Sequence, residues 1–227
     1  KAWAWGNYKY QSKSKKNLLY IKDQKELEFL TFYSDCINFS RDLINSPANK
    51  LNPSTYYSKI KNNNLFKSFN FIDYTEKEIN SNFPLTCAVG KSSFSKPKVI
   101  EITNRKLSKK DKPLVIIGKG VTFDTGGVNI KPGTSMRNMK KDMGGSAIAI
   151  SLFLLANYFL KKTKIVLIAP FAENAISSKS MRPGDVYTSV SGKSVEIAHT
   201  DAEGRLLLAD AIEKASYYNP CMTIDFA

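Results

Sequence analysis

The chain has 227 residues, 42% of them apolar, which is enough to bury the core of one large domain or two small ones. Its formal net charge is +14, but the lysines are scattered beside Asn and Ser, as in Lys61-Asn-Asn-Asn, and this indicates a solvated surface rather than a nucleic-acid-binding face. Three cysteines without a Cys-x-x-Cys pair and a single histidine, His199, argue against a disulfide framework, a histidine-based zinc site and a Ser-His-Asp triad.

The N-terminal part predicts a tail followed by two helices. Residues 1–16 are aromatic and then polar, and we interpret them as a tail or linker. A first helix is predicted from Asp23, which forms a pattern like a capping box with Glu26, and its apolar positions recur at helical spacing until Pro47. Asn52 followed by Pro53 predicts the start of a second helix, which runs to about residue 61.

The rest of the chain alternates short apolar runs with helices. Two helices are predicted, over residues 142–160 and 203–217, and the first is apolar nearly all round. Continuous apolar runs between helices indicate strands covered on both faces, so we expect an α/β fold with a mixed, largely parallel sheet flanked by helices. The predicted strands are residues 70–74, 98–102, 114–117, 165–169 and 222–226, the last read as a buried strand of a truncated chain.

Composition also bears on location. The most lipophilic run, residues 147–160, is too short to span a bilayer, so we interpret it as a buried helix and expect no membrane association. No secretory signal is visible, although the chain begins with Lys rather than Met. Unpaired, widely spaced cysteines suggest a reducing compartment, and we therefore expect a cytoplasmic protein.

Two glycine-rich stretches contain most of the candidate functional residues. They are Lys119-Gly-Val-Thr-Phe-Asp124-Thr-Gly-Gly and Thr200-Asp201-Ala-Glu203-Gly-Arg205, with Lys131 and Asp142 between them. Glycines allow the backbone to bend and approach a ligand closely. Four carboxylates, two lysines and an arginine at expected strand ends and loop mouths are the side chains of a two-metal hydrolytic site built without histidine.

Each of these residues also has a purely structural explanation when taken alone. Helix starts attract acids, and lysines are usually solvated. These explanations make Asp142 a helix N-cap, Asp201 and Glu203 first-turn acids, Lys119 and Lys131 surface lysines, and Arg205 a salt-bridge partner. They do not account for the concentration of four acids and three bases in glycine-rich loops.

Six stretches carry a common family pattern. They are Arg41-Asp-Leu-Ile-Asn-Ser-Pro-Ala-Asn, Val121-Thr-Phe-Asp-Thr-Gly-Gly, Met139-Lys-Lys-Asp-Met-Gly-Gly, Ala172-Glu-Asn-Ala-Ile-Ser, Arg182-Pro-Gly-Asp-Val and Thr200-Asp-Ala-Glu-Gly-Arg-Leu. Together they resemble the leucyl (cytosol) aminopeptidase family of metallopeptidases, especially its bacterial branch. The resemblance covers nearly the whole chain. It implies an incomplete catalytic domain over residues 17–227, truncated at the C-terminus, and a remnant of an N-terminal domain or linker in residues 1–16.

The resemblance implies a dinuclear metal site and two catalytic side chains. Asp124 and Glu203 would contact both divalent ions (Mn or Zn, with Mg as a further candidate), Asp201 one of them, and Lys119 and Asp142 the other. The two catalytic basic positions match Lys131 and Arg205, and a bicarbonate is implied at Arg205. Met139 matches a position lining the substrate pocket, with a core methionine near a helix start as the alternative. His199 stands where the family usually has Asn, and both a tolerated neighbour of the ligands and an altered substrate contact stay open.

The implied activity is removal of the N-terminal residue from peptides that have a free N-terminus, by a metal-activated water. The family also implies a homo-hexamer at full length. Whether this fragment is active stays open, because family members continue into a stretch that completes the pocket. Two alternatives stay open as well: a basic nucleic-acid-binding protein, and a remnant of the family that keeps the ligands without turnover.

Overall fold

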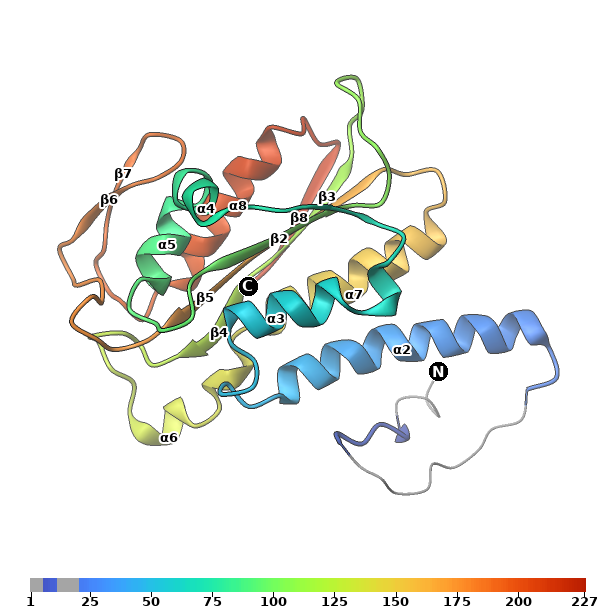
Figure 1. Cartoon of the computed structure of the whole chain (residues 1–227), viewed down its shortest axis with the longest axis horizontal. Helices are drawn as coiled ribbons and strands as arrows, with labels where there is room; N and C mark the ends of the chain where they lie inside the picture. Colours follow the sequence, from blue (N-terminus) through green and yellow to red (C-terminus); the bar gives the residue numbers. More distant parts are fainter. Residues whose placement is uncertain (1–5, 12–20) are drawn as a thin grey trace.

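The computed structural model describes residues 6–11 and 21–227, and within them a central sheet is covered by helices on both faces (Figure 1). The sheet has six strands in the order β1-β2-β5-β3-β8, with β4 also paired to β5. The strands are β1 (Asn70–Ile72), β2 (Lys98–Thr103), β3 (Leu114–Gly118), β4 (Gly120–Asp124), β5 (Ile165–Asn174) and β8 (Met222–Phe226), and β6 (Val186–Thr188) and β7 (Ser194–Glu196) form a separate hairpin.

The pairing directions confirm the predicted mixed, largely parallel sheet. β5 and β8 both pair with β3 in parallel, and β4 pairs with β5 in parallel, whereas β1–β2 and β2–β5 are antiparallel. Ile116 points to one face of the sheet and Val115 and Ile117 to the other, and all three are fully buried. A strand with both faces buried reads as a continuous apolar run, which explains why β3 was predictable.

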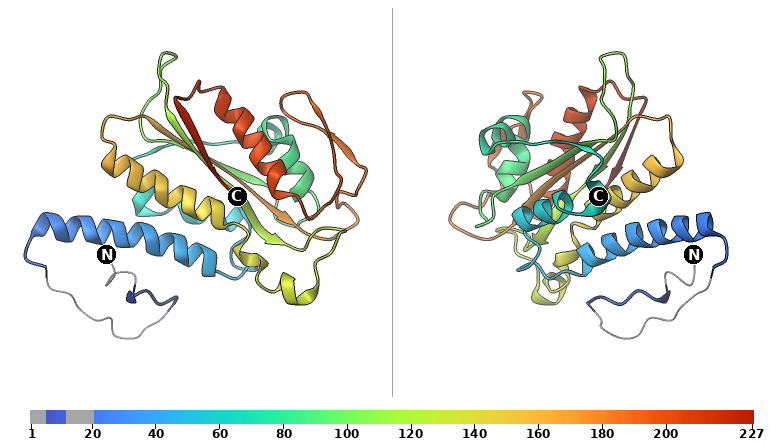
Figure 2. Two further views of the ribbon diagram at one scale, coloured as in Figure 1. Left: turned by 180° about the vertical axis from the view of Figure 1, so that it is seen from behind. Right: turned by 45° about the vertical axis from the view of Figure 1, so that its right-hand side comes forward.

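Helices cover the two faces of the sheet (Figure 2). One face carries α3 (Pro53–Lys61) and α7 (Gly144–Phe159), with α2 (Gln24–Asn45) packed on the outside of α7. The other face carries α4 (Glu76–Asn82), α5 (Pro84–Gly90) and α8 (Gly204–Ser216). Three single-turn elements complete the described part: η1 (Asn64–Phe66), α6 (Gly133–Met136) and η2 (Met139–Lys141).

The predicted helix starts follow local capping. Asp23 precedes α2 and accepts hydrogen bonds from Lys25 N (2.8 Å) and Glu26 N (3.0 Å), as expected for an N-cap. A reciprocal capping box forms between Asn52 and Thr55 at the start of α3, where Pro53 occupies the first turn. Both helices therefore begin where the sequence predicts.

Helix α7 is strongly apolar. The stretch Met139–Phe159, which contains it, is long and apolar enough to cross a membrane by length and composition, yet more than half of its most apolar 18-residue window is buried inside the fold. α7 lies between the sheet and α2, and Phe153 and Ile150 belong to the largest core cluster. It is a core helix, which confirms the predicted buried helix.

β3 and β4 form a single line of chain against β5, interrupted at Lys119. Ile117 pairs with Ile168 and Gly120 with Phe171, so Lys119 lies opposite Pro170. Proline carries no N–H and cannot donate to a ladder. The backbone of Lys119 forms its hydrogen bonds with residues outside β5: its N–H donates to Phe226 O (2.9 Å) and its carbonyl accepts from Ser146 N (2.9 Å). The sequence interpretation, in which the predicted strand 114–117 leads into a glycine-rich loop holding Lys119 and Asp124, is therefore wrong for residues 120–124, which continue the strand as β4.

The last strand also differs from its prediction. β8 was expected to be buried, but it lies at the edge of the described sheet and pairs with β3 alone. Its side chains are exposed or half-buried, and Met222 is 57% exposed. An apolar run does not distinguish an edge strand from a central one, because it records the side chains and not the neighbouring strand.

The predicted tail or linker of residues 1–16 lies largely outside the described residues. Within the described segment 6–11, Tyr8 OH donates a hydrogen bond to Asp42 Oδ1 (2.7 Å), and Tyr10 OH donates to Ser46 Oγ (3.3 Å). This segment therefore contacts the C-terminal end of α2.

Candidate metal centre

The five predicted metal ligands lie where β3 and β4 end and where helices begin. Lys119 separates β3 from β4, and Asp124 is the last residue of β4. Asp142 precedes α7, and Asp201 and Glu203 precede α8. In open α/β sheets the crevice beyond the carboxyl ends of the strands is the usual ligand site, so the topology places these side chains in that crevice.

Three carboxylates form a compact cluster. One ligand oxygen from each of Asp124, Asp201 and Glu203 lies within 4.8 Å of the others. Asp124 and Glu203 are each only 2% exposed. Burial and the negative charge of Asp124 raise the pKa of Glu203 to about 8. Such crowding of acids is costly unless a cation balances it, so the cluster favours cation binding.

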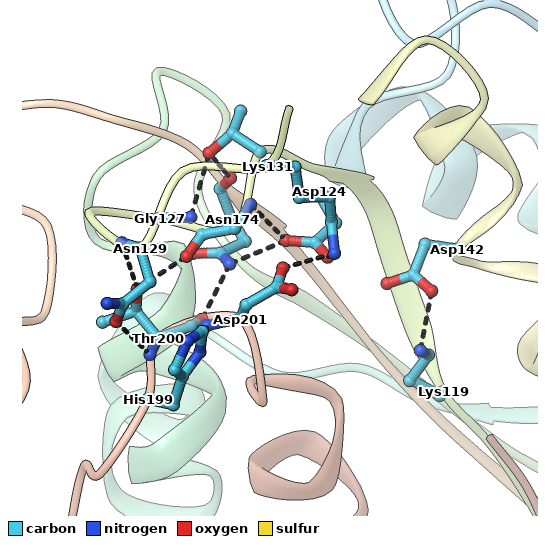
Figure 3. Close-up of polar contacts among 12 residues, drawn as sticks. Lys119, Asp124, Gly127, Asn129, Lys131, Asp142, Asn174, His199, Thr200 and Asp201 are labelled. Carbon is cyan, nitrogen blue, oxygen red and sulfur yellow. Dashed lines mark hydrogen bonds and ion pairs between the residues drawn. The ribbon is translucent and has the colours of Figure 1, made fainter. Parts of the chain in front are cut away.

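Lys131 supplies one positive charge to this cluster. Its Nζ lies 2.8 Å from Asp124 Oδ2 and forms a second ion pair with Asp201 (Figure 3). Burial alone would lower the pKa of Lys131, but hydrogen bonds to Asp124 and Asp201 outweigh it and raise the pKa above the ordinary value. The interpretation of Lys131 as a solvated surface lysine is therefore wrong.

Lys119 and Asp142 form a second, neighbouring pair. Their Nζ and Oδ1 atoms lie 2.8 Å apart, and Figure 3 shows the pair to one side of the Asp124–Asp201 cluster. Burial raises the pKa of Asp142. Helix α7 begins at Gly144 with Met143 in the cap position, and no side chain caps it. The alternative interpretation of Asp142 as an N-cap is therefore wrong.

The donor set fits divalent cations. Asp142 Oδ2 and Glu203 Oε2 are buried and have no hydrogen-bond partner within the described residues. Unpartnered buried carboxylate oxygens are expected where a cation is the partner, and oxygen-rich ligation suits Mn, Mg or Zn. Lys119 could join them only as the neutral amine, because an ammonium has no free lone pair.

A polar network that the sequence analysis missed holds two of these segments together. The buried Asn174 side chain, at the end of β5, donates to Asp124 Oδ1 (2.8 Å) and to Thr200 O (3.1 Å). Thr200 Oγ1 donates to Gly126 O (2.6 Å), and Asn129 Oδ1 accepts from Thr200 N (2.9 Å). The only signal for Asn174 in the sequence is that it lies in the stretch Ala172-Glu-Asn-Ala-Ile-Ser of the family pattern; it is an ordinary Asn five positions beyond the predicted strand 165–169.

Gly126 is required by the local backbone. Its φ of +87° is in the left-handed region, and a Cβ there would lie 3.0 Å from Asp201 Oδ1 and 3.0 Å from Lys131 N. Its own N–H donates to Asp124 Oδ1 (2.8 Å). The turn therefore folds the Lys131 loop tightly back over Asp124.

The remaining predicted site residues border the cluster. A cavity of about 480 Å³ is lined by Lys131, Met139, His199 and Asp201, among others. Asp201 N donates a hydrogen bond to His199 Nδ1 (3.2 Å), and the His199 side chain is exposed. Arg205 lies in the first turn of α8, is exposed, and forms no ion pair within the described part of the chain. The structural alternative of a salt bridge at Arg205 therefore finds no support there.

Comparisons with known proteins identify relatives of this chain. Residues 38–227 match the catalytic-domain model of the cytosol aminopeptidase family. A probable cytosol aminopeptidase from Corynebacterium efficiens is 40% identical over 206 residues, which are 90% of this chain and 41% of that protein. These matches favour a peptidase over a nucleic-acid-binding protein.

Solved structures with a similar fold include members of the same family. The crystal structure of the cytosol aminopeptidase from Coxiella burnetii matches with a TM-score of 0.85 and 34% identity over 98% of this chain and 49% of that one. The bottromycin maturation enzyme BotP in complex with Mn matches with a TM-score of 0.81 and 28% identity over 94% of this chain and 47% of that one.

The chain spans only about two fifths of the length of the curated relatives it matches. The match nevertheless covers most of the chain, including every candidate ligand. This chain belongs to the cytosol aminopeptidase family.

Proposed function

We propose that the protein is a metal-dependent aminopeptidase that hydrolyses the N-terminal residue from peptides. The observation that carries this proposal is the convergence of Asp124, Asp201 and Glu203 oxygens within 4.8 Å, beside the Lys119–Asp142 pair. The family membership supports peptides as the substrate class, and we propose that these peptides have a free N-terminus.

The ligand set accommodates two divalent ions. Asp124 and Glu203 would hold both ions, Asp201 would hold one, and Lys119 and Asp142 would hold the other. The four carboxylates contribute four negative charges and two dications four positive ones, so the loaded centre is close to neutral. Oxygen ligands do not discriminate strongly between Mn, Zn and Mg. The Mn in the BotP complex favours Mn, and we propose Mn or Zn.

The side chains around the centre have distinct roles in this proposal. Bound divalent ions supply Lewis acidity, which acidifies a water molecule and polarises the scissile carbonyl. Lys131, at the edge of the cavity, stabilises the negative charge that develops on the carbonyl oxygen. Arg205 in the first turn of α8 holds a bicarbonate near the cleft and so provides a proton acceptor.

The cavity beside the centre accepts the substrate. Met139 contacts the side chain of the N-terminal residue, and His199 contacts the part of the peptide that follows it. Both residues line the same cavity as Lys131 and Asp201, which supports this arrangement. Asp142 places negative charge near the substrate amine. We further propose a cytoplasmic location and assembly into a homo-hexamer, both on the strength of the family.

Metal binding by the 227-residue chain is the primary test. After chelator treatment, calorimetric titration with MnCl2 is expected to show two ions per chain, and Asp124→Asn is expected to remove both. Asp210→Asn is a matched control, because Asp210 is also a buried carboxylate but lies outside the cluster. Release of leucine from leucinamide, with Mn or Zn added, tests the activity. Ion uptake by the Asp124→Asn variant equal to that of the unaltered chain would overturn the proposal.

A further inference from the structure

The side chain of Lys119 lies directly against Gly204. A Cβ atom at position 204 would lie 2.5 Å from Lys119 Cδ, 3.1 Å from Nζ and 3.3 Å from Cε. Distances this short are well inside van der Waals contact, so an alanine and the present Lys119 conformation exclude each other. Gly204 is buried and is the first residue of α8, with no left-handed φ, so the position requires space rather than an unusual backbone.

Lys119, and not helix α8, would yield to a larger residue. Leu206 and Leu207 of the same helix are buried in the core beneath the hairpin, at 7% and 0% exposure, and they hold the helix in place. A lysine side chain has four rotatable bonds, so its far end moves at a low cost in free energy. In the structure that end pairs with Asp142 at 2.8 Å. A methyl group at position 204 would therefore drive the amine away from Asp142.

From this contact we infer that Gly204 is a positioning residue for Lys119. The missing side chain at position 204 is what allows the amine to reach the cation position next to Asp142, while the cluster of Asp124, Asp201 and Glu203 does not depend on it. This inference rests on the proposed function, because it assigns Lys119 and Asp142 to one of two ions. A bulkier residue at position 204 would then lower the affinity for one ion and leave the affinity for the other unchanged.

The chain offers a matched control in Gly144. It is the first residue of α7, just as Gly204 is the first residue of α8, but a Cβ there meets nothing within 4 Å. Gly→Ala at a strain-free helical position reduces the entropy of the unfolded chain, so Gly144→Ala should not lower the stability of the metal-free protein. Gly204→Ala also loses the Lys119–Asp142 pair, so its metal-free form should unfold at a lower temperature. The two substitutions are chemically identical and differ in the contact with Lys119.

The test is calorimetric titration of the metal-free chain and its variants with MnCl2, with thermal unfolding of each metal-free protein alongside. Gly204→Ala is expected to bind one ion with unchanged affinity and the second at least 10-fold more weakly, as for loss of a residue that orients a ligand. Gly144→Ala is expected to bind two ions as the unaltered chain does. In a Lys119→Ala background, where the clash is gone, adding Gly204→Ala should leave ion binding unchanged and should not lower the unfolding temperature.

The outcomes separate this inference from the proposed function. If the unaltered chain takes up no ions, the metal centre itself is wrong and the inference falls with it. If the unaltered chain and Gly204→Ala bind two ions equally well, only the inference is overturned. If Gly204→Ala does not fold, the double variant decides: folding like Lys119→Ala supports a clash with Lys119, and unfolding in that background contradicts it.

Discussion

Replacing Asn174 by leucine should lower both the stability of the chain and its affinity for metal ions. The two side chains have similar volume, so the change removes two hydrogen-bond donors without opening a cavity. Asp124 Oδ1 would keep only the N–H of Gly126, and Thr200 O would lose its Asn174 donor. Asn174 is 2% exposed, so water does not replace the lost bonds.

The size of the effect follows from the buried acceptors. A buried acceptor left without its donor costs about 1–3 kcal/mol, so two of them, one still partly satisfied, cost about 3 kcal/mol together. For a chain of this length 1 kcal/mol corresponds to about 2–4 °C, which predicts a fall in Tm of about 6–12 °C. Because Asn174 also orients a candidate ligand, ion affinity should fall by about 10- to 100-fold.

Asn104 provides the control for this prediction. Its Nδ2 also donates two hydrogen bonds, to Asn157 Oδ1 (3.1 Å) and Thr163 O (3.0 Å), and its Oδ1 accepts one from Ile165 N (2.8 Å), but these bonds lie near the C-terminus of α7 rather than at the candidate metal centre. Asn104→Leu should lower Tm by a similar amount and leave the Mn affinity unchanged. Thermal unfolding without metal and calorimetric titration at a temperature where both variants are folded measure the two quantities. If Asn174→Leu keeps the unaltered ion affinity, its role is only structural and the reasoning fails.

Three further predictions concern other side chains. Burial raises the pKa of Asp210 to about 6 from an ordinary 3.8, so the carboxylate destabilises the folded chain increasingly as pH rises from about 4 to 6. Asp210→Asn should therefore increase the free energy of urea unfolding by up to about 3 kcal/mol at pH 8 and by less toward pH 4. A gain that does not change with pH would contradict this assignment. Lys131→Ala removes an ammonium that competes with cations for Asp124, so Mn should bind at least as tightly while leucinamide hydrolysis slows about 10²- to 10³-fold; loss of ion binding would refute this role. Met139→Ala should lower kcat/KM for leucinamide by about 10-fold with unchanged ion stoichiometry, and an equal loss for alaninamide would exclude a side-chain pocket at this position.

The fold was predictable where local chemistry decides it. Asp23 and Asn52 cap their helices in the structure as the sequence predicts, because capping depends on residues within one turn. β4 was not predictable in the same way. Its pairing with β5 passes a proline at position 170, and a proline inside a run argues against a central strand on sequence grounds. The pairing is stabilised by distant segments, which a local pattern does not contain.

Some residues of the site were predictable from the sequence and others were not. Charged residues in glycine-rich loops stand out in a sequence, and the structure brings Asp124, Asp201 and Glu203 into one cluster. Neutral residues that support the site do not stand out in this way. Asn174 acts on the cluster through two hydrogen bonds, and Gly204 acts on Lys119 through the absence of a side chain. Neither property distinguishes them from other Asn and Gly residues in the sequence.

The hydrogen bond from Lys119 N–H to Phe226 O links the candidate metal centre to β8, at the edge of the described sheet. Edge strands fray before central ones, and amide exchange with solvent deuterium reports such opening residue by residue. Separation of β8 from β3 would expose the Lys119 amide, while the fully buried Ile116 and Ile117 remain paired with β5. Opening of the β3–β8 pairing thus affects a candidate ligand more than 100 positions away from Phe226 in the chain. The exchange rate of the Lys119 amide therefore reports how often β8 separates from β3 beside the candidate metal centre.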